Sequence, residues 1–411
     1  MPFFFSRGFL SFCFLSLSLA CSSELPAENN DAGSPTVNTG SCAVGSICEG
    51  NVAICNDPEN IWREDCVAMG MRCIVRSGCR VCDPGSSGCV DGARAACRGD
   101  GSGYDIIEEC PEGCAEGVCV NLCEEAARTF SYTGCEYWPV PVANQVDETF
   151  RFAVAIASAS DTPAEIEVTR GGQMVRSASL PPRTLEVIEL PWIDELKSAA
   201  DDETHYSVKV SDGAYRLTST APITVYQFNP LHYTVPRDCE RRNDEPDGRC
   251  LSYSNDASLL LPSTALSGSY INLGFPSLHL SYQLGAEQLA AKRAPATVTI
   301  IAIDDGPVEI QSPVPLAASA SGDVPAVNAG GRMSVNLARG EVLQLAVAPQ
   351  EICPEESPTS QRSPIACGSS SCVETACRAD RNSDPTGISI ESPGRLQVIS
   401  GHSCAFIPFD R

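Results

Sequence analysis

The cysteines constrain the fold of this chain more than any other feature. Its 411 residues contain 23 cysteines, far more than a reducing compartment leaves as unpaired thiols. Within residues 42–123, a set of six cysteines recurs as a second set 40–44 residues later. The first set is Cys48, Cys55, Cys66, Cys73, Cys79 and Cys82, and the second is Cys89, Cys97, Cys110, Cys114, Cys119 and Cys123. This spacing predicts a cysteine-rich module at residues 42–124, built from two repeats of about 41 residues.

Each repeat is too short to be stable through core burial alone, so we expect three disulfides in each. The spacing does not select one pairing among the many that six cysteines allow. Turn-forming dipeptides follow the first cysteine of each set, at Gly50–Asn51 and Asp91–Gly92, and they predict tight hairpins. The one C-x-x-C pair, Cys79 to Cys82, has no histidine nearby, so we expect no metal site.

The first 20 residues have the features of a secretion signal. Arg7 precedes an apolar run that ends at Ala20 and is too short to span a bilayer. The segment "LSLAC" resembles a bacterial lipoprotein box, which predicts lipidation of Cys21 and attachment to a membrane through this lipid; the alternative is ordinary cleavage after Ala20. Residues 21–41 are polar and rich in Pro, Asn and Ser, so we expect a disordered tether.

Residues 125–411 are typical of an all-β region. Segments such as "FRFAVAIAS" (150–158), "AEIEVTRGG" (164–172) and "TLEVIELP" (184–191) alternate with a period of two and end at turn residues. Only 192–203 and 285–293 suggest short helices. The predicted fold is therefore mainly β, with the disulfide-rich double repeat followed by a duplicated β-sandwich-like region or, alternatively, a propeller-like one.

The duplication is indicated by three pairs of similar segments in the same order. They are 162–172 with 294–306, 184–191 with 340–347, and 217–227 with 390–400. Two similar β units, packed as sandwiches or as blades, would produce this pattern.

Charge excludes one class of partner. The chain carries 52 acidic and 28 basic residues, for a net charge of −24. Such a surface repels phosphate backbones, so we expect no nucleic-acid partner.

Four motifs carry a family resemblance. In chain order they are "GCEYWPVPVANQVD" (134–147), "YQFNP" (226–230), "SNDASLLLP" (254–262) and "ISGHSCAFIP" (399–408). The set resembles the IgGFc-binding protein N-terminal domain family over about residues 134–411. That family includes many secreted or surface proteins of Gram-negative bacteria, and its name comes from an animal mucus protein that binds antibody Fc. The resemblance implies a non-enzymatic binding or adhesion role toward a protein or glycan ligand, and it defines no Fc-binding residue.

The remaining cysteines fit a domain that usually continues further. Cys239 and Cys250 bracket one loop, and the others bracket a second loop: Cys353, Cys367, Cys372 and Cys377. An odd number of cysteines remains once Cys13 and Cys21 are set aside. Because family members usually extend beyond the last motif, we expect either a C-terminally truncated domain or an unpaired Cys404. We interpret the motifs as structural, and we expect the charged loop 239–250 to be a presented surface.

Ser403 lies in a near-match to the nucleophile elbow of serine hydrolases. The eight residues after Ser403 contain no histidine, whereas that fold places its histidine after the serine. His402 is adjacent to Ser403 and so points to the opposite face of a strand, and at i, i+2 from Cys404 it lies too far for a nucleophile–base contact. The carboxylate pairs Asp201–Asp202 and Asp304–Asp305 lie in turns and are interpreted as solvated.

We therefore expect no catalysis and no cofactor. Two alternatives to a binding protein stay open: a structural scaffold of the envelope, and a hydrolase that uses Ser403 on surface polymers.

Overall fold

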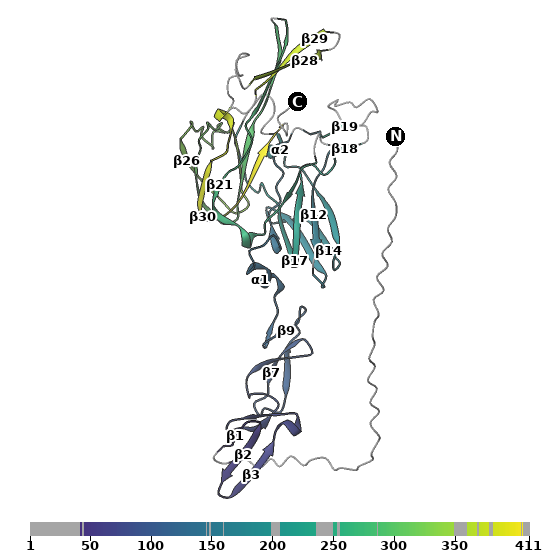
Figure 1. The fold of residues 1–411 in the computed structure, drawn as a ribbon, viewed down its shortest axis with the longest axis vertical. Helices are drawn as coiled ribbons and strands as arrows, with labels where there is room; N and C mark the ends of the chain where they lie inside the picture. Colours follow the sequence, from purple (N-terminus) through teal and green to yellow (C-terminus); the bar gives the residue numbers. More distant parts are fainter. Residues whose placement is uncertain are drawn as a thin grey trace, which may run out of the picture. The chain divides into compact units, whose positions relative to one another are not determined.

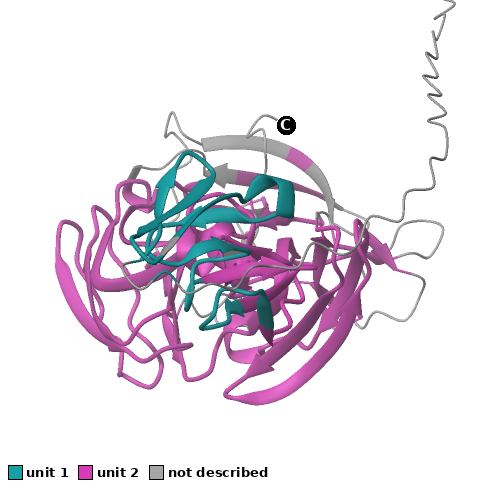
Figure 2. Cartoon of the chain, turned by 90° about the horizontal axis from the view of Figure 1, so that it is seen from below, with its two compact units in different colours: residues 1–86, 96–105 teal, residues 87–95, 106–411 magenta. Residues whose placement is uncertain are grey.

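The computed structural model describes residues 42–403 and 405, except 43–44, 145, 148, 159, 199–205, 236–249, 253–254, 286, 349–359, 368–369 and 378–380. The signal, the tether, Cys21, Cys239, Cys353 and Cys404 lie outside the described residues. The chain forms two compact units, residues 1–86 with 96–105 and residues 87–95 with 106–411 (Figure 2). The line between them passes through the cysteine-rich module.

The cysteine-rich module consists of short strands. They are β1 (Ile47–Glu49), β2 (Val52–Asp57), β3 (Asn60–Asp65), β4 (Arg72–Ile74), β5 (Gly78–Arg80), β6 (Ser87–Val90), β7 (Ala93–Cys97), β8 (Tyr104–Glu108), β9 (Cys114–Ala115) and β10 (Val118–Cys119), with a 3-10 helix, η1 (Val67–Met69). The predicted tight turns are confirmed: Gly50–Asn51 joins β1 to β2 directly, and both Asp91 and Gly92 have positive φ.

Two sets of three disulfides hold the module together. They are Cys42–Cys55, Cys48–Cys73 and Cys66–Cys79, then Cys82–Cys97, Cys89–Cys114 and Cys110–Cys119. In both sets the first cysteine pairs with the third, the second with the fifth and the fourth with the sixth.

The predicted phase of the repeat is wrong. Cys42 opens the first repeat and Cys82 opens the second, while Cys123 lies outside both and pairs with Cys135. A periodic spacing fixes the length of a repeat and leaves its starting point open, and the pairing supplies that point. The repeats are residues 42–79 and 82–119.

The second region is built mostly from strands. They are β11 (Gly134–Tyr137), β12 (Phe152–Ser158), β13 (Ala164–Arg170), β14 (Gln173–Leu180), β15 (Leu185–Leu190), β16 (Val208–Val210), β17 (Arg216–Phe228), β18 (Thr234–Val235), β19 (Cys250–Leu251), β20 (Ala257–Leu259), β21 (Ser267–Ile271), β22 (Leu278–Leu284), β23 (Glu287–Ala294), β24 (Ala296–Ala302), β25 (Gly306–Gln311), β26 (Arg332–Leu337), β27 (Val342–Ala346), β28 (Ser360–Cys367), β29 (Ser370–Cys377) and β30 (Ser389–His402). The helices are α1 (Leu122–Ala127), α2 (Asp194–Ser198), η2 (Ser263–Ala265) and η3 (Arg381–Ser383).

One of the two expected short helices is wrong. A helix does form within 192–203, as α2. Residues 285–293 instead contribute to β23, which pairs along its length with β22. Pairing with a neighbouring strand overrides the weak helix propensity of the Ala-rich sequence.

Most strands after β10 form two sheets in which five strands follow the same order. In the first, the order is β14-β13-β17-β12-β15, with β11 and β20 also on β17; in the second it is β26-β25-β30-β24-β27-β16, with β21 also on β30 (Figure 1). We call residues 134–262 the N-terminal β half and 263–403 the C-terminal β half. A further sheet, β23-β22-β29-β28, belongs to the C-terminal half.

Each sheet curls around its longest strand. Ile223 of β17 pairs with both Ser158 and Gly134, and Thr218 pairs with both Glu167 and Glu136. Because β11 takes one edge of β17 at both positions, β12 and β13 share the other edge, and the sheet folds over at the bulge between them. This curled arrangement is the sandwich-like alternative rather than a propeller.

The two halves correspond residue by residue along β17 and β30. The β11–β17 register shifts at Gly134/Glu136, and the β21–β30 register shifts in the same way at Ser267/Ser269. The next tyrosine in each half donates a hydrogen bond across this bulge: Tyr137 to the Ile223 carbonyl and Tyr270 to the Leu396 carbonyl. The predicted match of 217–227 with 390–400 is therefore confirmed, and that of β15 with β27 holds to within one residue.

The third predicted match is wrong. It aligned 162–172, which contains β13, with 294–306, which contains β24. By topology β13 corresponds to β25, and β24 corresponds to β12. Alternating strands resemble one another locally, and only the pairing distinguishes them.

Two large apolar clusters stabilise the β halves. One fills the C-terminal half and includes Val298, Ile300 and Leu396. The other fills the N-terminal half and also takes in Ile301 and Val342 of the C-terminal half. The two halves therefore share buried surface. None of the helices among the described residues is long and apolar enough to cross a membrane.

Candidate protein-binding surface

The first family motif runs along the joint between the two β halves. Trp138, Val140 and Val142 are buried in the same cluster as Ile301 and Val342. The guanidinium of Arg339, from the C-terminal half, lies 5.3 Å from the centre of the Trp138 ring. The segment 138–143 is thus an apolar strip inserted between the halves.

Amide side chains of the C-terminal half fix the backbone of this strip. The Ala143 N–H donates to Gln344 Oε1 at 3.0 Å, and Gln397 Nε2 donates to the Trp138 carbonyl at 2.7 Å. Both glutamines are buried, so each hydrogen bond satisfies a backbone group that water does not reach.

The motif "YQFNP" fixes the other side of the same strip. Gln227 Oε1 accepts a hydrogen bond from the Val140 N–H at 3.0 Å, and Asn229 Oδ1 accepts one from the Val142 N–H at 3.3 Å. Both side chains are buried. The interpretation of these motifs as structural agrees with this geometry.

The last motif performs the equivalent task in the C-terminal half. His402, the last residue of β30, corresponds to Asn229, which directly follows β17, and its Nε2 lies 2.8 Å from the Pro276 carbonyl oxygen. Since a carbonyl only accepts, His402 Nε2 donates. Ser400, the counterpart of Gln227, donates to the Leu273 carbonyl.

The elbow interpretation of Ser403 finds no support in this geometry. Ser403 is buried, and its Oγ has no hydrogen-bond partner among the described residues. Its neighbour His402 holds backbone through Nε2. Nucleophilic catalysis needs a base within hydrogen-bond reach of an accessible hydroxyl.

Asp304 lies in a turn with its side chain partly exposed, as expected, but it also forms an ion pair that was not expected. Its two carboxylate oxygens accept hydrogen bonds from the Arg395 guanidinium, each at 2.8 Å. These bonds and the Arg395 charge lower the pKa of Asp304 to about 2. No group of His, Cys, Asp and Glu side chains in the described part of the chain could hold a metal ion.

The other predicted cysteine sites lie in or near the β halves. Cys250, in β19, and Cys372, in β29, are both disulfide-bonded. Cys367 ends β28 and Cys377 ends β29. Residues 239–249 of the expected presented loop lie outside the described residues.

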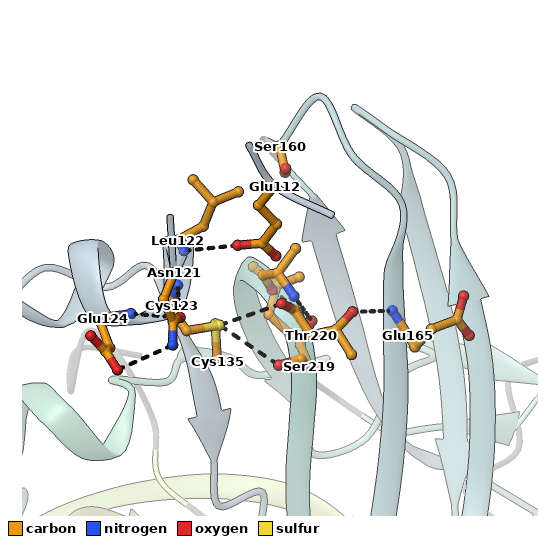
Figure 3. The surroundings of a disulfide bond; sticks show 12 residues. Glu112, Asn121, Leu122, Cys123, Glu124, Cys135, Ser160, Glu165, Ser219 and Thr220 are labelled. Carbon is orange, nitrogen blue, oxygen red and sulfur yellow. Dashed lines mark hydrogen bonds between the residues drawn. A yellow bond between two sulfur atoms is a disulfide. The ribbon is translucent and has the colours of Figure 1, made fainter. Parts of the chain in front are cut away.

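The disulfide Cys123–Cys135 ties α1 to β11 (Figure 3). The Cys123 sulfur lies 3.8 and 3.6 Å from the carbonyl oxygens of Ser219 and Thr220, at the bulge of β17. Asn121 caps α1 by accepting hydrogen bonds from the Cys123 and Glu124 N–H groups. The chain therefore enters the N-terminal half through a capped, cross-linked helix at the bulge.

An apolar row crosses the outward side of the N-terminal half. Phe152, Val154 and Ile156 of β12 point into the core, so Ala155 and Ala157 point outward. Ala155 pairs with Val187 of β15 and with Tyr226 of β17, and Tyr226 pairs with Leu259 of β20. We call this row, with Leu185 beside it, the outer face: Leu185, Val187, Ala155, Ala157, Tyr226 and Leu259.

Large exposed apolar side chains dominate the outer face and flank its small alanines. Leu185 is 63% exposed and Val187 is 44% exposed, and both lie on β15, which has no strand on its far edge among the described residues. An exposed apolar row beside an open sheet edge is typical of a protein-binding surface. Two of its residues, Tyr226 and Leu259, belong to family motifs interpreted above as structural, and the alternation in "FAVAIAS" predicts an outward row of alanines.

The comparisons with known proteins concern the C-terminal half. Residues 256–411 match the family model described as IgGFc binding protein. The resemblance expected over residues 134–411 is thus found for 256–411, and the N-terminal half repeats the topology. No curated protein matches the chain. One solved structure, an anti-sigma factor domain-containing protein, is similar at 8% identity and a TM-score of 0.14, covering 64% of this chain and 82% of that one. A TM-score this low supports no argument.

The matched family model is named for binding IgG Fc, and its match covers less than half of the chain. The seven described disulfides at residues 42–135 indicate an extracellular or secreted protein.

Proposed function

Taking the match of residues 256–411 to the IgGFc binding protein family as the premise, we propose that this chain is a secreted adhesion protein that binds protein through its outer face. One observation carries the proposal. Val187 and Tyr226, which flank Ala155 in one row, are exposed, while the corresponding row of the C-terminal half, Gln344–Thr299–Ile399, is covered by a strip of protein.

The attachment of the protein completes the proposal. Lipidation of Cys21 would anchor the chain in the outer membrane, and residues 21–41 would tether the cysteine repeats to it. Mass spectrometry of the mature N-terminus tests this part: a diacylglyceryl group on Cys21 is the expected result, and a bare N-terminus contradicts it.

Binding measurements with the purified full chain test the outer face. The probes are immunoglobulin G Fc fragment, fibronectin and a glycan array, read out by biolayer interferometry at chain concentrations below 1 µM. We expect a protein probe to bind and V187D to weaken that binding at least tenfold, about 1.4 kcal/mol, by placing a charge in the contact.

A matched control separates a local effect from loss of fold. Ile61, in the first cysteine repeat, is 76% exposed, and I61D should leave binding unchanged. Binding by glycans alone, or protein binding that V187D does not alter, would overturn the proposed role of the outer face.

A further inference from the structure

The C-terminal half carries an exposed copy of the strip that is buried at the joint. The segment after β21 corresponds to the segment after β11, because Tyr270 and Tyr137 occupy the same place in the bulge. Val140 is fully buried, whereas its counterpart Leu273 is 72% exposed. We call the exposed apolar side chains of this segment the ridge: Ile271, Leu273 and Phe275. Their buried counterparts are Trp138, Val140 and Val142.

The ridge is held in place like its counterpart. Ser400 donates to the Leu273 carbonyl and His402 Nε2 to the Pro276 carbonyl. These bonds come from β30, just as Gln227 of β17 and the following Asn229 hold the buried strip. The ridge is therefore presented by its own half, with its apolar side chains exposed.

The outer face is the uncovered copy of the surface that receives the buried strip. Strand pairing aligns Leu185 with Val342, Ala157 with Ile301, and Val187 with Gln344. The C-terminal members of these pairs are fully buried. One molecule thus buries one joint and leaves both sides of a second joint uncovered, one on each half.

We infer that the ridge of one molecule docks on the outer face of a second copy of this chain, repeating the internal joint between molecules. The inference rests on the proposed function of the outer face and names its partner. The internal joint supplies the geometry, because the ridge is the counterpart of the buried strip and the outer face is the counterpart of the sheet side that this strip covers.

Polar groups at the second joint fit this arrangement. At the internal joint the Ala143 N–H needs the Gln344 acceptor. The ridge has Pro276 in place of Ala143, and a proline has no backbone N–H. The outer face has Val187 in place of Gln344, and a valine side chain has no acceptor. Loss of the donor and of the acceptor together leaves no buried group unpaired there.

The contact joins two different surfaces, so it does not close on itself in a dimer. Each added molecule exposes a new ridge or a new outer face, so head-to-tail chains follow, which close into a ring only where the rotation at the contact allows it. The net charge of −24 makes the copies repel one another, so association should strengthen as salt screens this repulsion.

Sedimentation velocity of the full disulfide-bonded chain tests the inference at 1–200 µM and about 0.15 M salt. We expect the weight-average mass to rise with concentration beyond that of a dimer. L273D removes the ridge and V187D removes the outer face, so each variant alone should stay monomeric. Mixed together, the two variants should form a one-to-one dimer and nothing larger, because each retains the surface that the other lacks.

The controls make every outcome decisive. I61D should associate like the wild type, and circular dichroism should show that all three variants are folded. A monomeric wild type, association that survives both substitutions, or a mixture of L273D and V187D that stays monomeric would overturn the inference. A monomer that still binds a protein probe would leave the proposed function standing, while a self-associating chain that binds no probe would remove the adhesion role alone.

Discussion

The cysteine repeats and the β halves are both duplicated, yet different forces stabilise them. The apolar cluster of the first cysteine repeat consists of Ala53, Cys66 and Cys79, with a few partly buried neighbours. The β halves bury large side chains such as Phe152, Leu217 and Ile300. Cross-links act on the unfolded chain by restricting it, whereas burial acts on the folded chain.

The two duplicated regions also differ in whether the main stabilising contacts stay within one copy. Each cysteine repeat closes all three of its disulfides within itself. The β halves share one apolar cluster and exchange buried hydrogen bonds through Gln344 and Gln397. The copies of a duplicated fold can therefore each carry their own cross-links, as in the cysteine repeats, or be joined by shared burial, as in the β halves.

Reduction of the disulfides should produce the largest loss of structure, in the cysteine repeats and not in the β halves. If the repeats stayed folded, the contrast between the two regions would not hold. Each repeat loses three cross-links of about 2–4 kcal/mol each, more than so small a core replaces. Hydrogen exchange with mass spectrometry should show lost protection in β2 and β7 and retained protection in β12 and β24. If the repeats stay protected under reduction, or if the β halves lose protection together with them, disulfides are not the main stabilisation of the repeats alone.

Truncation of the β cores comes next. Ile223 and Leu396 occupy corresponding positions of the two halves and are fully buried. I223A and L396A should each cost about 2–5 kcal/mol in the free energy of unfolding, through lost burial and the cavity left behind. Urea unfolding followed by tryptophan fluorescence measures this. The exposed control I61A should change the free energy of unfolding by less than about 0.5 kcal/mol.

A substitution at the joint between the halves should cost less stability than the core truncations, and it should change the shape of the unfolding transition. Q344L removes the acceptor of the buried Ala143 N–H, and an unpaired buried group costs about 1–3 kcal/mol. Because this bond connects the halves, calorimetry should show a broadened or split transition. Q311L, at an exposed pair with Arg332, should leave the transition sharp. A simple shift in both variants would mean that the joint does not couple the halves.

Much of the fold was predictable because its signals are local. Alternation identified most strands, Asp91–Gly92 identified a hairpin, and regular cysteine spacing identified a double repeat. The wrong predictions have non-local causes. The phase of the repeat depends on the Cys42–Cys55 pairing, and the strand at 287–294 depends on β22.

The candidate site was harder to predict for the same reason. Ala155 and Thr299 both alternate with core residues, so the sequence assigns both to the outward side of a strand. Only the fold shows that the strip 138–143 covers the row of Thr299, whereas Val187 and Tyr226, on either side of the buried Ala155, stay exposed. The motifs identified the covering strip and its holders Gln227 and Asn229, and they contain Tyr226 and Leu259 of the outer face without indicating that these side chains are exposed.

Removal of an ion pair should change stability least, and the change should differ between the β halves and the cysteine repeats. Arg395 lowers the pKa of Asp304 to about 2. A lowered pKa stabilises the folded state above the ordinary Asp pKa of about 3.9, and this contribution is lost as the pH falls through about 2. More than a third of both side chains is exposed, so D304N should cost less than about 1 kcal/mol at pH 7.

The pH dependence distinguishes this pair from an exposed pair in the cysteine repeats. The urea midpoints of wild type and D304N should differ at pH 7 and converge at pH 2. Arg98 also lowers the pKa of Asp105, but that pair is more exposed and lies where cross-links stabilise the fold. D105N should therefore show no measurable change at either pH. A D304N difference that persists at pH 2 would mean that packing, and not charge, makes Asp304 stabilising.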